Sequence, residues 1–336
     1  MRSTTAYHLA GAETYRLRSS QLFQARVSEI PKEYKYLYNI GSNLQNQSKN
    51  SKKIYIPDDG KVFLQVDQRG AEAVCVAYLC NNGNYRKLMK AGIKSHCFVA
   101  LHLFKKVWER ELDMNLDEYV EAGVEELPHL PHWEDINNVI KLSDTWESSR
   151  RYYFMAKMVS HSANYGIKGP TFCLNVLDKS QGTVSLSLKE ANAYLNFYRM
   201  DLFPEILNWH IRTIQELSKN NRVLHNLFGY PRRFTGKWGE QLFKEAYAFK
   251  PQSTVGCITH IAFTRLQNYI EENDADWDIL ANTHDSYLIQ CPRKEVDICR
   301  ETAKKMMTME LMNDRGERFT IYSDCTMSDK SWGDMT

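Results

Sequence analysis

The stretch from Thr145 to Tyr165 constrains the fold most strongly, because no Gly or Pro interrupts it. Asp144 followed by Glu147 matches a helix N-terminus, where such side chains bond free backbone N–H groups. Gly166 can close the same helix in the left-handed conformation. The sequence therefore predicts a helix of about 20 residues, roughly 30 Å long.

The predicted helix has two different faces, because successive residues advance by about 100° around its axis. The polar face carries Arg150, Lys157, His161 and Asn164, and the apolar face carries Tyr152, Met155, Ala156, Val159 and Ala163. One face can pack into a core while the other presents cations, an imidazole and an amide. By itself this pattern is typical of any amphipathic helix with a solvated face, and it identifies no function.

The composition is that of an ordinary globular protein. The chain has 336 residues, 43% hydrophobic and 25% charged, which allows one large domain or two closely packed ones. A net charge of +2 provides no general attraction for nucleic acid, so any such contact must come from local clusters. The eight cysteines lack zinc-like spacing, and no secretion signal or membrane-length apolar run is present. We expect reduced thiols in a cytoplasmic protein.

One acidic residue lies at a predicted strand-to-helix junction. Lys61 to Val66 is a compact apolar strand pattern that ends at Asp67. Ala71 to Leu79 follows as a buried helix with Glu72 in its first turn. A single Asp after an apolar strand is usually a cap or a turn residue, so Asp67 needs a partner before it indicates chemistry.

A second acidic residue supplies that partner. The segment Asp278 to Gln290 has strand character on both sides of His284-Asp285-Ser286, which predicts a β-hairpin with His284 and Asp285 at its tip. Two strand-end carboxylates from distant sequence positions suit magnesium, which prefers a few hard oxygen ligands plus substrate oxygens.

Three ordered motifs resemble family-A DNA polymerases, the bacterial DNA polymerase I type and its phage relatives. Lys157, His161 and Tyr165-Gly166 resemble the nucleotide-binding helix of the fingers, V-D-Q-R-G-A-E-A resembles motif A, and H-D-S resembles motif C. The sequence departs from the family at Tyr153, where an Arg is usual, at Arg69-Gly70 in place of Ser-Gln, and at Ser286 in place of Glu.

The resemblance implies a role for each matching residue around two Mg²⁺ ions. Asp67, the carbonyl of Gln68 and Asp285 would bind the metals, with Lys157 as a further catalytic group. The incoming nucleotide would be contacted by Glu72, His96, Lys157, His161 and Tyr165. Because Tyr153 replaces the family Arg, we expect Arg150, on the same predicted helix face as Lys157, to take over a phosphate contact.

The resemblance also implies contacts with primer-template DNA. The matching positions are Arg16, Asn43, Asn46, Arg232, Arg233, Gln252 and His284. Gln252 belongs to the run A-F-K-P-Q-S-T, which we expect to open a helix.

The implied fold is α+β, a right-hand polymerase palm with an antiparallel sheet plus helical fingers. The expected domains are residues 1–92 as the first part of the palm, 93–182 as the fingers and 183–336 as the second part of the palm. We expect no thumb or exonuclease domain in this chain, and hence a separate polypeptide or a truncation. Residues 105–141 are expected to be a helical insertion, in which His129 and His132 give only a weak zinc signal.

The function implied by resemblance is template-directed addition of dNTPs to a primer 3′ end. Two alternatives stay open. A single-subunit RNA polymerase shares both Asp residues and the Lys-to-Tyr helix, but Glu72 disfavours it because such enzymes leave room for the 2′-hydroxyl. A catalytically silent DNA-binding subunit is favoured by the departures from the family pattern and disfavoured by the retained carboxylates and Lys157.

Overall fold

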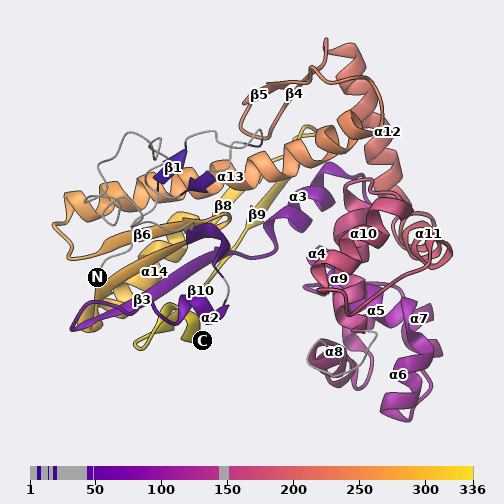
Figure 1. Cartoon of the computed structure of the whole chain (residues 1–336), viewed down its shortest axis with the longest axis horizontal. Coiled ribbons are helices and arrows are strands. Elements are labelled where there is room, and N and C mark those ends of the chain that lie inside the picture. The colour runs from indigo at the N-terminus through magenta and orange to yellow at the C-terminus, as the bar shows by residue number, and fades with distance from the viewer. Residues whose placement is uncertain are drawn as a thin grey trace, which may run out of the picture. The chain divides into compact units, whose positions relative to one another are not determined.

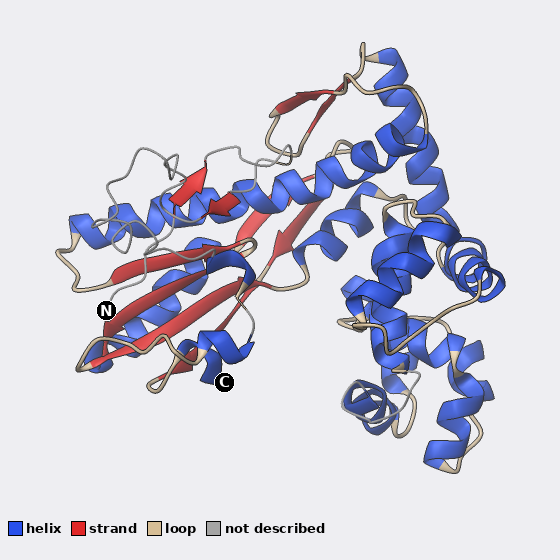
Figure 2. Cartoon of the chain, viewed as in Figure 1, coloured by secondary structure: helices blue, strands red, loops and turns tan. Residues whose placement is uncertain are grey.

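The computed structural model describes residues 6–8, 14, 18–20, 44–47, 49–143 and 151–335. These residues form two units (Figures 1 and 2). The first contains the main sheet and comprises Met1–Glu72, His225–Arg232 and Phe249–Thr336. The second is largely helical and comprises Ala73–Leu224 and Arg233–Ala248. The predicted divisions at residues 92/93 and 182/183 do not coincide with these boundaries.

The sheet of the first unit is built around the predicted strand. Its four strands run in the order β10-β3-β7-β6, and all neighbours are antiparallel. The strands are β3 (Lys61–Gln68), β6 (Asp278–Thr283), β7 (Ser286–Pro292) and β10 (Ser323–Ser328). The predicted strand before Asp67 and the predicted hairpin are thus confirmed.

The two faces of the sheet follow from the alternation of side chains along β3. Val62, Leu64 and Val66 are fully buried, and each stabilises the fold by about 1.5–3 kcal/mol. Helix α14 (Val296–Met307) packs against β3, β7 and β10 (Figure 1). The intervening side chain of Phe63 belongs to the other face and joins an apolar cluster with Leu44, Ala281, Leu288 and Trp332.

The first unit is completed by short elements and part of one long helix. The short elements are β1 (Ala6–His8), β2 (Arg18–Ser20), η3 (Leu44–Asn46), α2 (Lys49–Lys52), η7 (Arg293–Glu295), β8 (Met309–Met312), β9 (Arg318–Ile321) and η8 (Trp332–Asp334). Helix α13 (Glu240–Glu272) contributes its residues from Phe249 onward. Among the described helices, none combines the length and the apolar character that crossing a membrane requires.

The second unit is a set of packed helices (Figure 1). They are α3 (Ala71–Leu79, whose first two residues belong to the first unit), α4 (Asn84–Lys90), α5 (Ser95–Leu103), α6 (Lys105–Leu112), α7 (Asp117–Glu121), η4 (Leu127–His129), α8 (Trp133–Leu142), α9 (Tyr152–Asn164), α10 (Gly169–Lys179), α11 (Leu188–Asn196), the π-helical η6 (Phe197–Leu202) and α12 (Pro204–Lys219). Strands β4 (Val223–His225) and β5 (Pro231–Arg233) form a hairpin, of which residues His225–Arg232 belong to the first unit. The predicted helix at Ala71–Leu79 is confirmed, as is the helical character of residues 105–141.

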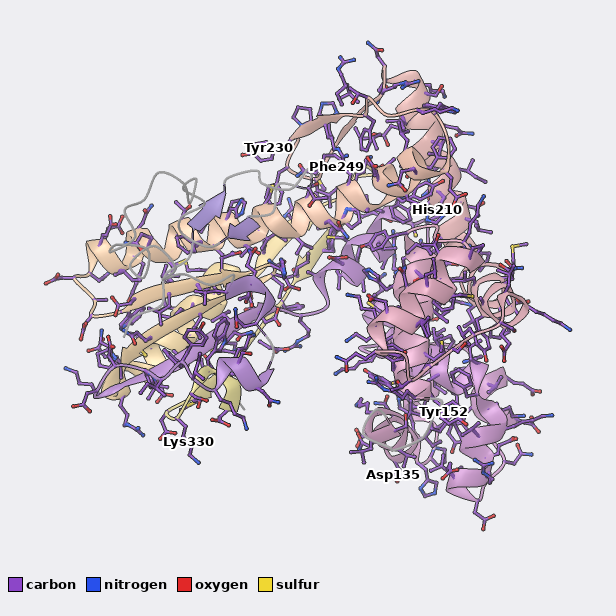
Figure 3. All side chains as sticks on the ribbon, viewed as in Figure 1. Asp135, Tyr152, His210, Tyr230, Phe249 and Lys330 are labelled. Atoms are coloured by element: carbon purple, nitrogen blue, oxygen red, sulfur yellow. The ribbon has the colours of Figure 1, made fainter. Side chains whose placement is uncertain are left out.

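A buried polar network holds the C-terminal end of α9 in this unit. The Asn164 side chain donates to the hydroxyl of Tyr85 at 3.0 Å and accepts from the hydroxyl of Tyr198 at 2.8 Å. Its carbonyl oxygen lies 2.7 Å from Nε2 of His210, which Figure 3 labels. The prediction that Asn164 lies on an exposed polar face is therefore wrong, because three buried partners satisfy it.

Helix α9 also begins later than predicted. Arg151 has a φ of +37° and stands at the N-terminal cap of α9, which starts at Tyr152; the predicted cap at Asp144 and Glu147 lies outside the described residues. The guanidinium of Arg151 lies 4.5 Å from the ring centre of Phe154, a cation–π contact that stabilises this start. The C-terminal prediction is confirmed: Gly166 has a φ of +70°, and Ile167 N–H donates to the carbonyl of Ser162 at 2.9 Å.

No helix opens at Pro251, contrary to the prediction. Pro251 lies inside α13, which continues through it. A proline there removes one backbone hydrogen bond and costs about 3 kcal/mol in a helix interior. Burial of Phe249, Val255 and Ile258 on both sides of it offsets that cost. Ser253 does not cap a helix; its hydroxyl donates to the carbonyl of Phe249 at 2.6 Å.

Candidate active site

Asp67 is the penultimate residue of β3 and lies in the middle of a row across the sheet. The strand registers place Asp324 opposite Asp67 on one side and Ser286 opposite it on the other. Thr283 of β6 follows Ser286 in the same row. Directly opposed residues share a face of the sheet, so all four side chains emerge on one side.

Asp285 lies beside this row, in the two-residue loop between β6 and β7. Thr283 pairs with Ser286, which leaves only His284 and Asp285 at the tip. The N–H of Gln68 donates to the carbonyl of Asp285 at 3.2 Å and ties the tip to β3. The structure therefore brings Asp67 of β3 close to Asp285 of the hairpin tip, as the sequence predicted.

The turn holds His284 in an unusual conformation. Its φ is +65°, in the left-handed region that two-residue hairpin loops normally fill with glycine or asparagine. Its side chain is exposed. Such outliers persist where surrounding structure holds them, and they gather at functional sites.

The carboxylate of Asp67 fits a divalent cation. Burial, and then the charge of Asp285, raise the pKa of Asp67 to about 7. Its Oδ1 atom is buried and has no hydrogen-bond partner among the described residues, which is costly for an ionised oxygen. A bound cation would remove both penalties.

The protein supplies only part of a coordination shell. Within the described ranges, no group of three or more His, Cys, Asp or Glu side chains has the arrangement of a metal cage. Mg²⁺ commonly binds through one or two carboxylates and completes its shell with water and substrate phosphates. One carboxylate near the end of β3 and one at the neighbouring hairpin tip match that kind of site.

Neighbouring polar residues fix the positions of these carboxylates. The Gln68 side chain is buried on the opposite face and donates to the carbonyl of Val255 at 3.1 Å and the hydroxyl of Thr259 at 2.6 Å. Because α13 holds that side chain, the predicted metal contact of Gln68 concerns its backbone carbonyl. Ser286 is buried and lies 2.5 Å, oxygen to oxygen, from the Thr283 hydroxyl.

The helical unit carries a separate cationic surface at the start of α5 and along α9. Lys157 and His161 are exposed on α9, one turn apart. The rings of His161 and Tyr165 are 5.1 Å apart, and those of His96 and Tyr153 are 6.1 Å apart. Burial, followed by the charges of Lys157, Lys94 and His161, lowers the pKa of His96 to about 4. This surface is suited to an anion.

Several predicted residues cannot be placed. Arg16, Asn43 and Arg150 lie outside the described residues, as does the side chain of Asn46, the last residue of η3. The reason for expecting Arg150 beside Lys157 was a continuous helix. Because α9 begins at Tyr152, that reason no longer holds.

The remaining predicted contacts fall on several elements. Glu72 is half-buried in the first turn of α3, and Gln252 is half-buried inside α13. In β5, the Arg232 guanidinium is 6.0 Å from the ring centre of Phe249, and Nη1 of Arg233 donates to the carbonyl of Asn221 at 3.3 Å. The DNA contacts predicted for these residues therefore remain predictions.

The sequence reasoning did not place three charged residues beside Asp67. Asp324 lies opposite Asp67, and Arg69 pairs with Asp324. Lys52 lies with its Nζ 4.2 Å from the ring centre of Trp332, and its charge acts on Asp67. Strand pairing over more than 250 residues fixes the position of Asp324, and no local pattern signals it.

Comparison with known proteins identifies the fold. No protein-family profile matches the chain. The polymerase domain of Pol1 from M. smegmatis, solved in complex with DNA primer-template and dNTP, superposes with a TM-score of 0.63. The match covers 98% of this chain and 48% of the other at 15% identity. The chain has the fold of a DNA polymerase I polymerase domain.

The sequence comparison agrees with this family resemblance. DNA polymerase I of Caldicellulosiruptor bescii is 21% identical over 309 residues, which is 90% of this chain. The chain spans 29% of the length of that relative. The predicted similarity to family-A polymerases and the predicted α+β polymerase fold are thus confirmed.

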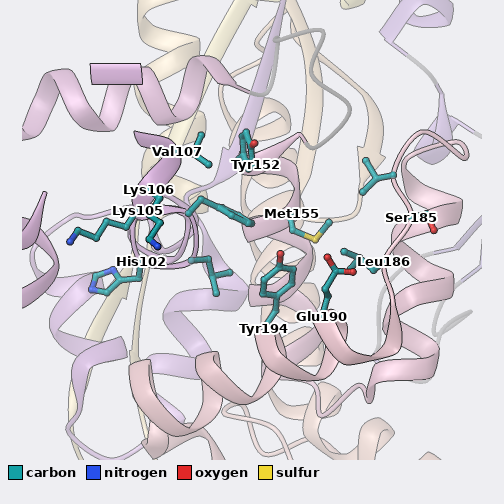
Figure 4. Close-up of a pocket in the computed structure, with 13 residues that line it drawn as sticks. His102, Lys105, Lys106, Val107, Tyr152, Met155, Ser185, Leu186, Glu190 and Tyr194 are labelled. Atoms are coloured by element: carbon teal, nitrogen blue, oxygen red, sulfur yellow. The ribbon is translucent and has the colours of Figure 1, made fainter. Parts of the chain in front are cut away.

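A cavity of about 580 Å³ lies elsewhere in the helical unit (Figure 4). Tyr152, Met155, Tyr194 and Glu190 line it, together with residues around Lys106. Of the residues predicted to bind nucleotide or DNA, those that the structure describes do not line it. Glu190 belongs to the capping box of α11 and accepts from the N–H of Ser187 at 2.9 Å, so its carboxylate already has a structural role.

Proposed function

We propose that this chain is a template-directed DNA polymerase that adds dNTPs to a primer 3′ end. The observation that carries the proposal is the pair Asp67, near the end of β3, and Asp285, in the loop that precedes the neighbouring strand β7, with Oδ1 of Asp67 buried and without a partner among the described residues. Joining nucleotides is in-line phosphoryl transfer, which needs alignment and charge neutralisation more than covalent chemistry.

Asp67, Asp285 and the carbonyl of Gln68 are proposed to hold two Mg²⁺ ions. Such ions neutralise phosphate charge and activate the primer 3′-hydroxyl as a nucleophile. The protein's own contribution is rigid placement. Gln68 anchors β3 to α13, and the pairing of Thr283 with Ser286 fixes the hairpin tip. His284, at that tip, would contact the primer end.

The cationic surface of the helical unit is proposed to bind the incoming nucleotide. Lys157 would offset the triphosphate charge or donate a proton to the leaving pyrophosphate, and His161 would stack on the base or sugar. His96 is neutral near pH 7, so it would donate or accept a single hydrogen bond at a phosphate oxygen. Tyr165 supports the ring of His161, and a phosphate contact from Arg150 stays a prediction.

The remaining roles concern DNA and the choice of sugar. Glu72 is proposed to exclude a ribose 2′-hydroxyl, which favours a DNA polymerase over an RNA polymerase. Primer-template contacts are proposed for Arg16, Asn43, Asn46, Arg232, Arg233 and Gln252. Incorporation of rNTPs as efficiently as dNTPs by the wild type would favour the RNA polymerase alternative.

The need for a partner chain that supplies thumb and exonuclease functions also stays a prediction. Primer extension with a heparin trap, which prevents rebinding to DNA, measures how many nucleotides the chain adds in one encounter. We expect this chain alone to dissociate after few additions, and synthesis of long products in a single encounter would contradict the prediction.

Primer extension with Mg²⁺ and dNTPs tests the proposed function. We expect Asp285→Asn to reduce extension at least about a hundredfold, because charge stabilisation at the reacting centre is lost. Asp297→Asn is the control, since its side chain is 96% exposed at the start of α14. Failure of the wild type to extend any primer, alone or with cell extract, would support the silent-subunit alternative.

A further inference from the structure

Asp324 adds a third carboxylate beside the proposed metal site. The register of β10 with β3 pairs Asp324 directly with Asp67. Directly opposed residues of antiparallel strands have Cβ atoms about 5 Å apart and share a face.

The guanidinium of Arg69 binds both oxygens of this third carboxylate. Nε of Arg69 donates to Oδ2 of Asp324 at 2.9 Å, and Nη2 contacts Oδ1, so the guanidinium binds with both arms. The N–H of Arg69 also donates to the carbonyl of Tyr322 at 2.8 Å, which fixes the backbone from which the side chain starts.

The pair places two opposite charges next to a site that must attract cations. A free Asp324 would add negative charge beside Asp67, and a free Arg69 would repel a cation there. Held together, the two charges largely cancel. The side chains are 63% and 54% exposed, so water and salt weaken the effect without removing it.

We propose that the Arg69–Asp324 ion pair sets the affinity of the Asp67–Asp285 site for divalent cations. Arg69 does so as a positioning residue, by directing Asp324 away from the cation and cancelling its charge. This inference rests on the proposed function of that site.

Direct Mn²⁺ binding to the whole chain tests the inference without nucleotide, DNA or turnover. Free Mn²⁺ is measured by electron paramagnetic resonance at low ionic strength. Arg69→Ala should lower the Mn²⁺ Kd about two- to fivefold, and Asp324→Asn should raise it by a similar factor. The double variant should return near the wild-type value, because both charges are gone. Arg69→Lys should keep most of the wild-type affinity.

A similar ion pair, between Arg293 just after β7 and Asp329 just after β10, provides the control. Nη1 and Nη2 of Arg293 both donate to Oδ2 of Asp329 at 3.1 Å, with side chains 64% and 44% exposed. Asp329 follows the last residue of β10 and is five residues from Asp324, which corresponds to roughly 17 Å along an extended chain. Arg293→Ala should leave the Mn²⁺ Kd unchanged.

The outcomes separate the inference from the proposed function. If the wild type binds Mn²⁺ and Asp285→Asn weakens that binding, while Arg69→Ala and Asp324→Asn leave the Kd unchanged, only the inference is overturned. If Asp285→Asn binds Mn²⁺ as the wild type does, the proposed metal site itself fails and the inference with it. A tighter Kd in Arg69→Ala that disappears in the double variant supports the inference.

Discussion

Asp67 faces Ser286 across the pairing of β3 with β7, so it lies one residue away from Asp285 at the hairpin tip. The hydroxyl of Ser286 is engaged by Thr283 and by Nε2 of Gln65, the latter at 3.3 Å. The residues next to Asp67 on the β7 side of the sheet, Ser286 and Thr283, are therefore neutral and hydrogen-bonded. Charge repulsion at Asp67 comes mainly from Asp285 at the hairpin tip and more weakly from Asp324 on β10.

We predict that Asp67 makes the metal-free protein less stable as pH rises. Its folded pKa of about 7 lies above the unfolded value of 3.8, so between these values the folded state binds the extra proton. This contribution is therefore present below about pH 4 and is lost as pH rises through 7. With EDTA, Asp67→Asn should raise unfolding stability at pH 8.5 by about 1–3 kcal/mol and by about half as much at pH 5.5.

Urea unfolding at the two pH values measures this effect. Added Mg²⁺ at pH 8.5 should stabilise the wild type and not Asp67→Asn, because the cation replaces the proton at the carboxylate. Equal urea midpoints for the two proteins at both pH values would show that Asp67 ionises without penalty.

Local patterns predicted the parts of the site that one segment determines. The apolar run ending at Asp67, the helix beginning at Ala71 and the hairpin around Asp285 each have alternation or turn signals within a few residues. The closing glycine of α9 was predictable for the same reason, since only a residue tolerant of positive φ suits that position.

Features that depend on distant partners were not predictable. The burial of Asn164 is decided by hydroxyl groups from α4 and η6, and its place on the helical wheel gave the wrong answer. The capping pattern at Asp144 marks where a helix can start, whereas α9 starts at Tyr152, whose ring packs against Trp108 from α6. The continuation of α13 through Pro251 is likewise decided by burial.

We predict that Gly166 is needed at the end of α9 for two reasons. Its φ of +70° disfavours a side chain, and a Cβ would come within 2.8 Å of the Tyr247 ring. Gly166→Ala should therefore cost about 2–4 kcal/mol of unfolding free energy. Gly182→Ala is the matched control, because Gly182 has a φ of +81° with no atom within 4 Å of a Cβ. It should cost only about 1–2 kcal/mol, and equal losses in urea unfolding would remove the steric argument.

The Asn164 network gives a prediction about stability. Asn164→Leu removes both side-chain hydrogen bonds and leaves the Tyr85 and Tyr198 hydroxyls buried without that partner. We expect a loss of about 2–4 kcal/mol, against about 1 kcal/mol for Tyr198→Phe, which removes one of the two bonds to Asn164. In a double-mutant cycle the two losses should be less than additive, because they share an interaction. Full additivity would indicate that the hydroxyl of Tyr198 is stabilised elsewhere.

Lys157 is the residue on which the nucleotide proposal depends most directly. It is exposed on α9 and adds positive charge beside His96. Lys157→Ala should slow incorporation of a single dNTP about a hundredfold in a single-turnover assay, because charge on the departing pyrophosphate is no longer offset. Lys157→Arg should recover part of the rate, since the charge is kept but its geometry changes. Lys168→Ala is the control, because Lys168 is also exposed but forms an ion pair of 2.9 Å with Glu240. If both alanine variants slowed equally, the effect would reflect general surface charge, and Lys157 would have no specific role at the nucleotide.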